Sequence, residues 1–559
     1  MNILGLSSYY HDSSACLVKD GVLISAVQEE RFNRIKNCSD FPIQSINFCI
    51  QQGNISFSDI DYVAYYEQPY IKFQRILEDH IEKFPLSFSS FLRNIPQWLQ
   101  DRLIIPMILR KELGYEGKVL FIPHHYSHAS SSFFLSPFDE AGIITADGVG
   151  EFATTCIGFG KANKIRFSGK INYPHSLGLL YSAFTGYLGF KVNSGEGTTM
   201  ALASFGEPDF IKEFENIIHI ASDGSYQLNT SYFSYTSNKR MFSEKLVSLL
   251  GKPRIPEAEI TDRHKAIAAT LQNVVEEALI KIARNTCKTS QSGNLCMAGG
   301  VFLNCVANQK ILDLAEVDQV FIQPGSGDAG GSIGAAFFVW NQLLKNPRGF
   351  VLDHAYLGPK YSDKDIKAAL QKNILPYNEL PDNELLNKVA DKIEAGMTVG
   401  WFQGNLEFGP RALGNRSILG DARRPEMVDI LNHRIKHREW FRPFAPIVKE
   451  EKAFEYFEVK YPSPFMLLAP KVKTDKAHLI PAITHIDGTA RLQTVSKKTN
   501  PLLWNLLDVF ESKTGIPVII NTSFNLKGEP IVCKPEEAIN DYLKSEMDCL
   551  VLGNCFIEK

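Results

Sequence analysis

Short apolar runs and turn-rich polar stretches follow one another near the N-terminus, a pattern typical of β-strands. Residues 2–7 form an apolar run that predicts a buried strand, and a polar loop over 8–14 follows it. Residues 15–18 and 22–27 predict two further strands, joined by Asp20-Gly21, a dipeptide that favours a tight hairpin turn. The pattern therefore predicts a strand, a polar loop and a hairpin.

The same order of elements is predicted a second time from about residue 141. Residues 143–146 are apolar, and the loop DGVG over 147–150 follows them. Strands are then predicted at 154–159 and 165–167, with a turn at Ala162-Asn163 between them. A duplication of this kind is typical of the ASKHA nucleotide-binding fold, in which two similar halves grip the phosphates of a nucleotide.

The next part of the chain combines a long helix with glycine-rich loops. Helical spacing dominates 264–284. One face of that helix carries the apolar residues Ile267, Leu271, Val274, Val275, Ala278 and Ile282. Residues 295–298 predict a strand that runs into Gly299-Gly300, and the glycine-rich stretch 324–334 predicts a loop that opens a helix of small residues.

A domain boundary is predicted in the region 346–360, which contains Pro and Gly and shows little periodicity. Beyond it, helices are predicted at 383–395 and 502–514, and strands at 398–402 and 517–521, with a basic stretch containing Gly and Pro at 409–425. The expected fold class is α/β. A duplicated domain over 1–350 precedes a smaller α/β domain over 351–559.

Composition argues for an ordinary globular chain. Its 559 residues carry a formal net charge of −3, which gives no electrostatic reason to expect nucleic acid or an anionic membrane as partner. The ten cysteines form no CxxC pair, so we expect buried free thiols in a reducing cytosol. Neither a signal peptide nor a long apolar run is present in the sequence, and we expect a cytoplasmic protein without a membrane span.

Four residues suggest a metal site. His124 and His128 stand four apart at the start of a predicted helix, a spacing that puts both rings on one face. Asp147 and Asp328 lie in glycine-rich loops. Each of these residues has a simpler explanation, as a core histidine or a turn aspartate. Taken together, two histidines and two carboxylates suit Fe(II), Mn or Zn better than Ca.

Candidate anion-binding groups gather in the second domain. Arginine forks match phosphate oxygens, and arginines beside Gly, Pro and aromatic residues favour a pocket over a solvated surface. The candidates are Arg411, Arg416, Lys436, Arg438, Arg442, Arg491, Asn521, Thr522, Ser523 and Asn525. In the first domain, Gly299 and Gly300 either let the backbone approach a ligand closely or simply begin a helix.

A series of longer motifs carries a resemblance to a known family. In order along the chain they are HDSSA (11–15), EERF (29–32), HHYSHA, DGVGE (147–151), SLGLLYSAFTGYLGFKVNSGE (176–196), GGVFLN, SGDAG, FGPRALGNRSIL, FRPFAP and NTSFN. Together they resemble the NodU/CmcH family of O-carbamoyltransferases over essentially the whole chain. The resemblance implies an ASKHA-type, TsaD-like domain followed by a YrdC-like domain.

The resemblance also implies a role for each site residue. In the second domain, ATP and carbamoyl phosphate would form carbamoyladenylate with the help of Mg²⁺. The residues assigned to this site are Arg411, Arg416, Lys436, Arg442, Arg491, Asn521 and Ser523, with Lys436 and Arg442 as catalytic groups.

In the first domain, a transition metal, Fe(II) or another divalent ion, would be bound by His124, His128, Asp147 and Asp328, and nucleotide by Gly299, Gly300 and Asn304. His11, with Asp12 beside it, is the candidate general base or acceptor-positioning group. The expected partner is a small-molecule hydroxyl acceptor, such as a sugar or natural product, and a homodimer is possible.

Two other functions remain open at this point. A tRNA-modifying enzyme of the threonylcarbamoyl type has related domains, but it should carry a basic surface that the net charge does not indicate. A non-catalytic ASKHA-fold nucleotide-binding protein would not need the arginine-rich second domain. A sugar kinase is a weaker option, because that class does not explain residues 360–559.

Overall fold

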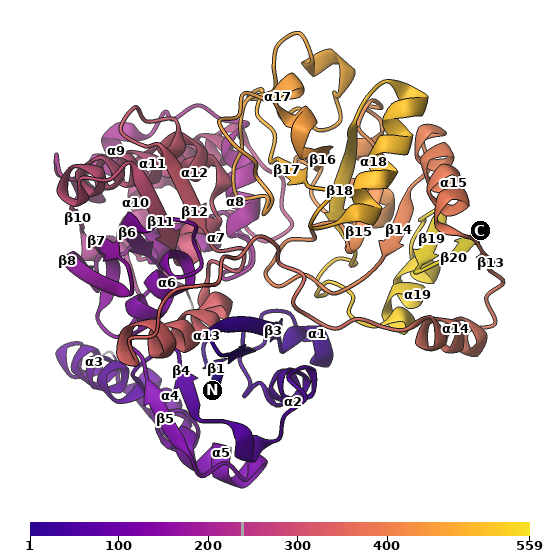
Figure 1. Cartoon of the computed structure of the whole chain (residues 1–559). Helices are drawn as coiled ribbons and strands as arrows, with labels where there is room; N and C mark the ends of the chain where they lie inside the picture. Colours follow the sequence, from indigo (N-terminus) through magenta and orange to yellow (C-terminus); the bar gives the residue numbers. More distant parts are fainter. Residues whose placement is uncertain (86, 236–239) are drawn as a thin grey trace. The chain divides into compact units, whose positions relative to one another are not determined.

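A computed structural model describes residues 1–85, 87–235 and 240–559 (Figure 1). The chain divides into two compact units. The first comprises Met1–Glu29 and Asn37–Val351, and the second comprises Glu30–Lys36 and Leu352–Lys559. The short segment Glu30–Lys36 therefore belongs to the second unit, although the chain on both sides of it belongs to the first.

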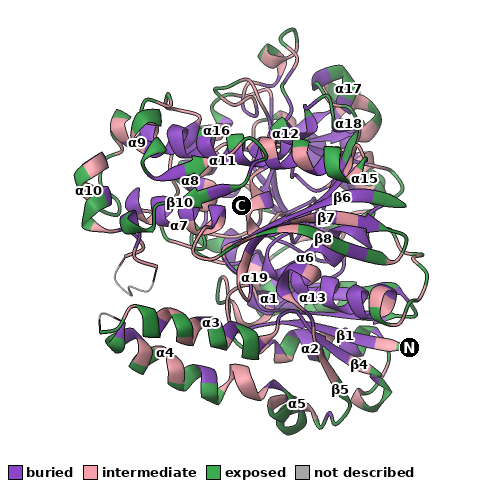
Figure 2. Ribbon diagram, turned by 90° about the vertical axis from the view of Figure 1, so that its left-hand side faces the viewer, coloured by how far each residue is buried: buried purple, intermediate pink, exposed green. Residues whose placement is uncertain are grey.

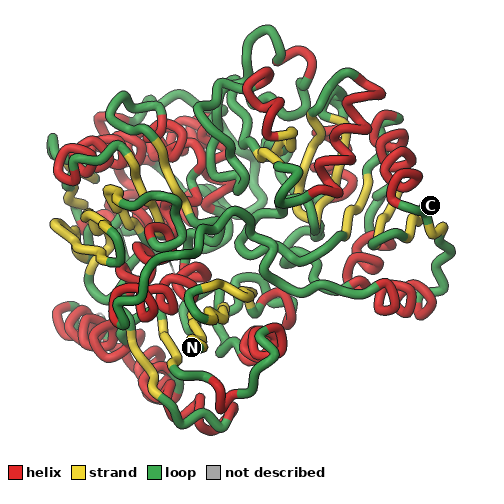
Figure 3. Tube along the Cα trace, viewed as in Figure 1, coloured by secondary structure: helices red, strands yellow, loops and turns green. Residues whose placement is uncertain are grey.

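The first unit contains two five-stranded sheets with matching topology (Figures 1 and 3). In the first sheet, β1, β2 and β3 form an antiparallel meander, and β4 and β5 are added in parallel beyond β1. In the second sheet, β6, β7 and β8 form the meander, and β11 and β12 are added in parallel beyond β6. The identical strand order confirms the predicted duplication and with it the ASKHA-type α/β fold.

Of these strands, β1, β2, β3, β6, β7, β8 and β11 lie where strands were predicted, whereas β4, β5 and β12 were not predicted. Their bounds are β1 Asn2–Ser7, β2 Ser14–Lys19, β3 Val22–Gln28, β4 Tyr62–Tyr65, β5 Lys118–Phe121, β6 Glu140–Ala146, β7 Ala153–Lys161, β8 Lys164–Asn172, β11 Asn294–Ala298 and β12 Gln319–Ile322. A small hairpin adds β9 Ile218–Ile220 and β10 Tyr226–Leu228. Asp20 and Gly21, with φ of 49° and 80°, make the predicted hairpin turn between β2 and β3.

The helices of the first unit are α2 Ile43–Gln52, α3 Pro69–Glu82, α4 Phe88–Gln100, α5 Ile105–Leu113, α6 His124–Phe133, α7 Leu177–Tyr187, α8 Glu196–Ala203, α9 Ile211–Glu215, α10 Glu244–Leu250, α11 Asp262–Ser290, α12 Cys305–Leu312 and α13 Asp328–Phe337. α6 and α13 pack against each other, and every residue of α13 is buried (Figure 2). A Cβ atom on Gly334 would lie 1.7 Å from the Ser127 carbonyl oxygen, so glycine is required where these helices meet.

The second unit is built on an eight-stranded mixed sheet in the order β13-β20-β19-β14-β15-β18-β16-β17 (Figure 3). Its strands are β13 Asn378–Glu379, β14 Val399–Phe402, β15 Arg416–Asp421, β16 Ala445–Lys449, β17 Gln493–Val495, β18 Val518–Ser523, β19 Cys549–Leu552 and β20 Cys555–Glu558. Its helices are α1 Glu30–Asn33, α14 Asp363–Lys372, α15 Asp382–Glu394, α16 Met427–Asp429, α17 Ala453–Tyr456, α18 Pro501–Thr514 and α19 Pro535–Lys544. This architecture confirms the predicted α/β fold class.

Two broader expectations can be compared with the structure. All ten cysteines are buried and none is in a disulfide, as predicted from their scattered positions. Among the residues described, no helix combines the length and the apolar character needed to cross a membrane.

Candidate functional site

The four predicted metal ligands meet in the first unit. α6 begins at His124 and carries His128 one turn later, α13 begins at Asp328, and Asp147 directly follows β6. All four are buried, and their ligand atoms lie within 4.8 Å of one another. The close packing of α6 on α13 therefore brings together residues that are distant in the sequence.

The histidine nitrogens and carboxylate oxygens converge on a common point. His124 Nε2 lies 3.0 Å from His128 Nε2 and 3.0 Å from Asp147 Oδ2. Asp328 Oδ1 lies 3.7 Å from His124 Nε2 and 3.6 Å from His128 Nε2. Such an arrangement of two imidazoles and two carboxylates suits a transition metal better than Ca²⁺.

Asp328 shows that the residues present fit a cation. Its side chain is fully buried, and neither carboxylate oxygen has a hydrogen-bond partner in the described part of the chain. A buried carboxylate is costly unless a positive charge compensates it. Although burial lowers the pKa of His128, the carboxylates of Asp147 and Asp328 raise it to about 9. The carboxylates of Asp147 and Asp328 thus favour a positive charge at this point.

Two neighbouring groups hold the cluster in place. The Gly300 N–H donates to Asp147 Oδ1 at 3.0 Å. Glu151 accepts from the backbone N–H groups of His124 and Gln68, at 3.0 and 2.8 Å, and so caps the start of α6 with a negative charge. Glu151 was not among the predicted site residues. Its one sequence signal is that it closes the DGVGE loop after Asp147.

His11 lies in the loop between β1 and β2. Its Nδ1 is 2.9 Å from Asp12 Oδ2, and the other Asp12 oxygen accepts from Asn37 Nδ2 at 2.8 Å. Asp12 adopts a φ of 54°, which is strained for a residue other than glycine. Burial lowers the pKa of His11, but the charges of Asp328 and Asp12 raise it to about 10. His11 is thus electrostatically linked through Asp328 to the group formed by His124, His128 and Asp147.

The glycine pair approaches the same cluster. Gly299 has a φ of 105°, and a Cβ atom there would lie 2.1 Å from the Ala146 carbonyl oxygen. A Cβ atom on Gly300 would lie 2.9 Å from Asp147 Oδ1. Asn304 caps α12 by accepting from the Ala307 N–H at 3.1 Å. The close approach that the glycines permit in this structure is therefore to Asp147 and β6.

Lys436 is the centre of the predicted anion site in the second unit. It follows a π-helical turn over Ile430–Ile435, a feature often found at functional sites. Its Nζ donates to the Ser523 carbonyl, and to the carbonyl and Oδ1 of Asn525 at 3.0 and 2.8 Å. Burial holds the pKa of Lys436 well below its ordinary value, and Arg438, Lys36 and Arg442 lower it further.

Three arginines share this positive environment. Burial lowers the pKa of Arg438 well below its ordinary value, and the charges of Arg442 and Arg491 lower it further. Burial likewise lowers the pKa of Arg442, with Glu439 opposing and Arg491 adding to the effect. Like charges held together in a desolvated place repel one another, so this group of cations is suited to a bound polyanion.

The other predicted residues of the second unit are engaged within the protein. Arg416 lies in β15, is fully buried, and donates to the carbonyls of Gln403, Gly404, Asn415 and Pro359. Asn521 Nδ2 donates to the Ala412 carbonyl at 2.9 Å, next to the half-buried Arg411. The structure therefore brings Arg411 close to β18 but uses the donors of Arg416 to hold backbone loops.

Glu407 is a second residue that sequence reasoning missed. Its Oε1 accepts from the backbone N–H groups of Leu413, Asn415 and Arg416, at 2.8, 2.7 and 3.1 Å. One buried carboxylate thus shapes the FGPRALGNR loop.

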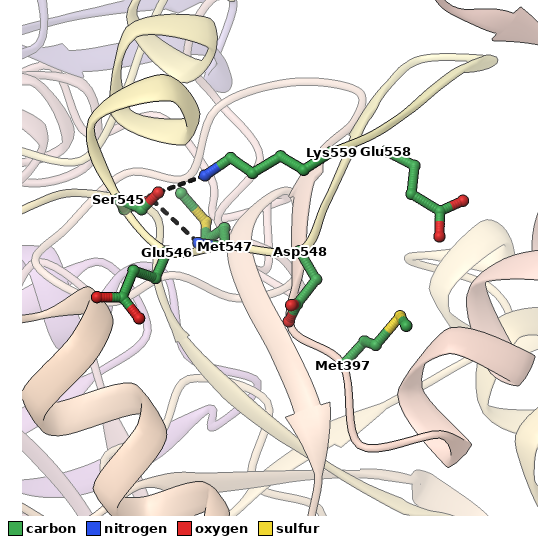
Figure 4. A pocket seen from close by; sticks show the side chains of 7 residues that line it. All are labelled: Met397, Ser545, Glu546, Met547, Asp548, Glu558 and Lys559. Atoms are coloured by element: carbon green, nitrogen blue, oxygen red, sulfur yellow. Dashed lines mark hydrogen bonds between the residues drawn. The ribbon is translucent and has the colours of Figure 1, made fainter.

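A cavity of about 310 Å³ beside the C-terminus contains none of the predicted site residues. Ser545, Met547 and Lys559 are among the residues that line it (Figure 4).

Comparison with known proteins identifies the family of the chain. The N-terminal carbamoyltransferase family model matches residues 2–337, and the C-terminal model matches residues 390–559. An uncharacterized protein of Synechocystis sp. is 44% identical over 100% of this chain and 97% of its own length. Nodulation protein NolNO of Sinorhizobium fredii is 35% identical over 99% of this chain and 80% of its own length.

Solved structures give a weaker likeness. The activator of 2-hydroxyisocaproyl-CoA dehydratase from Clostridium difficile has a TM-score of 0.31 and 11% identity, over 62% of this chain and 96% of its own. That likeness is too small to support an argument. The two family models and the long relatives are decisive, and the chain belongs to the carbamoyltransferase family that includes the nodulation proteins NodU and NolO.

Proposed function

We propose that this carbamoyltransferase is an ATP-dependent O-carbamoyltransferase with two reaction sites. The second unit activates carbamoyl phosphate as carbamoyladenylate, and the first unit transfers the carbamoyl group to a hydroxyl of a small molecule. The observation that carries the proposal is the cation group of Lys436, Arg438, Arg442 and Arg491. Burial lowers the pKa of the first three, and the charges of neighbouring cations lower it further. ATP and carbamoyl phosphate are both polyanions, and they react only where such charge offsets their repulsion.

The activation step consumes one water molecule in addition to ATP and carbamoyl phosphate. Water cleaves carbamoyl phosphate to carbamate and phosphate. A carbamate oxygen then attacks the α-phosphorus of ATP, and pyrophosphate leaves. In this step the three arginines bind and orient phosphoryl oxygens beside Lys436, with Mg²⁺ as the expected counter-ion of ATP. Ser523 and Asn525 fix the position of Lys436 by accepting its hydrogen bonds.

The transfer step takes place in the first unit in this proposal. The acceptor oxygen attacks the carbamoyl carbon, its proton passes to a base, and AMP leaves. His11 is the candidate base or positioning group, held by Asp12. A base must be neutral to accept a proton, and positive charge beside Asp328 would reduce the effect that now raises the pKa of His11.

A divalent metal bound by His124, His128, Asp147 and Asp328 would polarise the carbamoyl group and fix its orientation. Fe(II), Mn or Zn fits this ligand set. The protein itself would protect the intermediate, because burial of these four residues excludes water from a labile acyl group.

The test is to measure pyrophosphate release from ATP with and without carbamoyl phosphate. We expect release that depends on carbamoyl phosphate in the wild-type protein. Arg442→Ala should abolish it, while His11→Ala should retain it and lose transfer to an acceptor. As a control, Arg424→Ala removes an arginine that donates to the Glu394 carbonyl, and it should behave as wild type. If Arg442→Ala and His11→Ala fail at the same step, the two-site proposal is wrong.

A further inference from the structure

The segment Glu30–Lys36 contributes to the second unit in a way that the proposed chemistry does not use. It contains most of the EERF motif, and the α1 helix within it ends at Asn33. Two arginines extend from it into the second unit. Arg31 is 2% exposed and donates to the Gly409 carbonyl at 2.7 Å.

Arg34 binds a different loop of the same unit. Its Nη1 donates to the Ile531 carbonyl at 2.6 Å, and its Nη2 donates to the Pro530 carbonyl at 2.8 Å. Glu537 Oε2 lies 3.4 Å from Nη1. The guanidinium fork thus donates to two consecutive carbonyls from two separate nitrogens, a fixed geometry that the single nitrogen of a lysine does not provide.

The loop that Arg34 grips is the one that holds Lys436. Asn525 Oδ1 accepts from Lys436 Nζ at 2.8 Å, and Asn525 Nδ2 in turn donates to the Glu529 carbonyl at 2.7 Å. The turn closes through the Val532 N–H, which donates to the Phe524 carbonyl at 2.9 Å. A continuous chain of hydrogen bonds therefore runs from Lys436 through Asn525 to the residue before Pro530.

The backbone conformation of Arg34 also indicates that its side-chain contacts matter. Its φ of 62° places it in the left-handed region, which costs free energy in a residue with a side chain. Glycine would remove that cost, but it would also remove the guanidinium. Strained backbone of this kind persists where the surrounding contacts compensate for it.

We propose that Arg34 is a positioning residue of the anion site: by holding the Asn525–Ile531 turn through the carbonyls of Pro530 and Ile531, it fixes the acceptors of Lys436. Arg31 holds the Gly409 end of the loop that leads to Arg411 in the same manner. The assignment of a role in catalysis rests on the proposed activation of carbamoyl phosphate in this unit. The positioning of the turn itself does not depend on that chemistry.

The experiment compares Arg34→Ala and Arg34→Lys with wild type and with the matched control Arg424→Ala. Hydrogen exchange reports on the turn, and we expect faster exchange of the Val532 amide in Arg34→Ala but not in Arg424→Ala. In pyrophosphate release dependent on carbamoyl phosphate, kcat/KM of Arg34→Ala should fall roughly 10- to 100-fold, as for a misplaced catalytic group. Arg34→Lys should recover part of that loss, because it keeps one of the two hydrogen bonds.

Each other outcome has a definite meaning. Unchanged exchange in Arg34→Ala overturns the proposal, and so does faster exchange with wild-type kinetics. If Arg34→Ala does not fold, Arg34→Lys and Arg34→Gln provide the same comparison. If wild type releases no pyrophosphate, the proposed function fails on its own, and calorimetric titration with inorganic pyrophosphate then decides. If Arg34→Lys or Arg34→Ala binds pyrophosphate about tenfold or more weakly than wild type, the positioning role is supported. If the affinities are equal, the proposal is overturned.

Discussion

His124 and His128 hold their Nε2 atoms 3.0 Å apart inside the first unit. Two neutral imidazoles with lone pairs facing each other at this distance repel, so a proton or a metal ion must lie between them. Asp328 adds a buried carboxylate with no hydrogen-bond partner in the described chain. A cation at this point would compensate the buried carboxylate and bind both imidazole nitrogens.

Removal of a ligand should empty this site. We expect Asp328→Ala and His124→Ala each to lower metal content about tenfold or more, because one of four ligands is lost. His125→Gln is the matched control on the same helix, since the His125 nitrogens face Thr145 Oγ1 and the Ala153 carbonyl instead. Elemental analysis of the purified variants measures the outcome, and full occupancy in both ligand variants would contradict the assignment.

Glu151 should matter for stability as well as for the site. Glu151→Gln keeps the size of the side chain but removes the negative charge that caps α6 at His124. We expect a loss of about 1 kcal/mol in unfolding free energy, as for other helix caps. Glu140→Gln, at an exposed pair with Lys161, should cost much less. Denaturant titration compares the two, and an equal effect would argue against a capping role.

The two meanders of the first unit were visible in the sequence, because their strands are locally consistent, whereas the parallel strands β4, β5 and β12 were not predicted. β1 has the predicted bounds, and the repeat of strand, loop and hairpin indicated the duplication that the two sheets show. The four candidate ligands were also named from the sequence, although only the packing of α6 on α13 shows that Asp328 reaches His124. Sequence spacing alone carries no information about that distance.

The second unit was less predictable for physical reasons. β15 begins with Arg416, and a central strand with a buried arginine contradicts the usual apolar pattern. The structure resolves this, because the guanidinium lies 3.6 Å from the centre of the Phe402 ring and donates to backbone carbonyls. The membership of Glu30–Lys36 in this unit could not be predicted either, since it depends on contacts with residues some 500 positions away, such as Ile531.

The raised pKa of the Asp541 carboxyl should make the stability of the protein depend on pH. Burial and the nearby Glu529 raise its pKa to about 7, with Arg34 and Lys436 opposing. The folded state therefore binds a proton more tightly than the unfolded state, whose carboxyl titrates near 3.8. The contribution of the protonated Asp541 carboxyl to the free energy of unfolding is fully present below pH 3.8 and is lost as the pH rises through 7.

Asp541→Asn should remove this pH dependence. We expect the variant to be more stable than wild type at pH 8, where wild type must bury a charged carboxylate, and to lose this advantage below pH 4. Unfolding curves at several pH values measure the difference. A constant difference between the two proteins from pH 4 to pH 8 would show that Asp541 keeps an ordinary pKa in the folded state.

The acceptor should be a small hydroxylated molecule and not RNA. Lys and Arg number 59 against 62 acidic residues, so long-range attraction to a phosphate backbone is weak. The cations that gather in the second unit are also poorly placed to follow such a backbone: Lys436 is only 4% exposed, and Arg438, Arg442 and Arg491 are half-buried. A tRNA binder makes several phosphate contacts, and its affinity falls steeply as salt rises. We expect no gel shift with bulk tRNA at physiological salt and no change in pyrophosphate release when tRNA is added. Micromolar or tighter binding with a steep salt dependence would favour the RNA-modifying alternative.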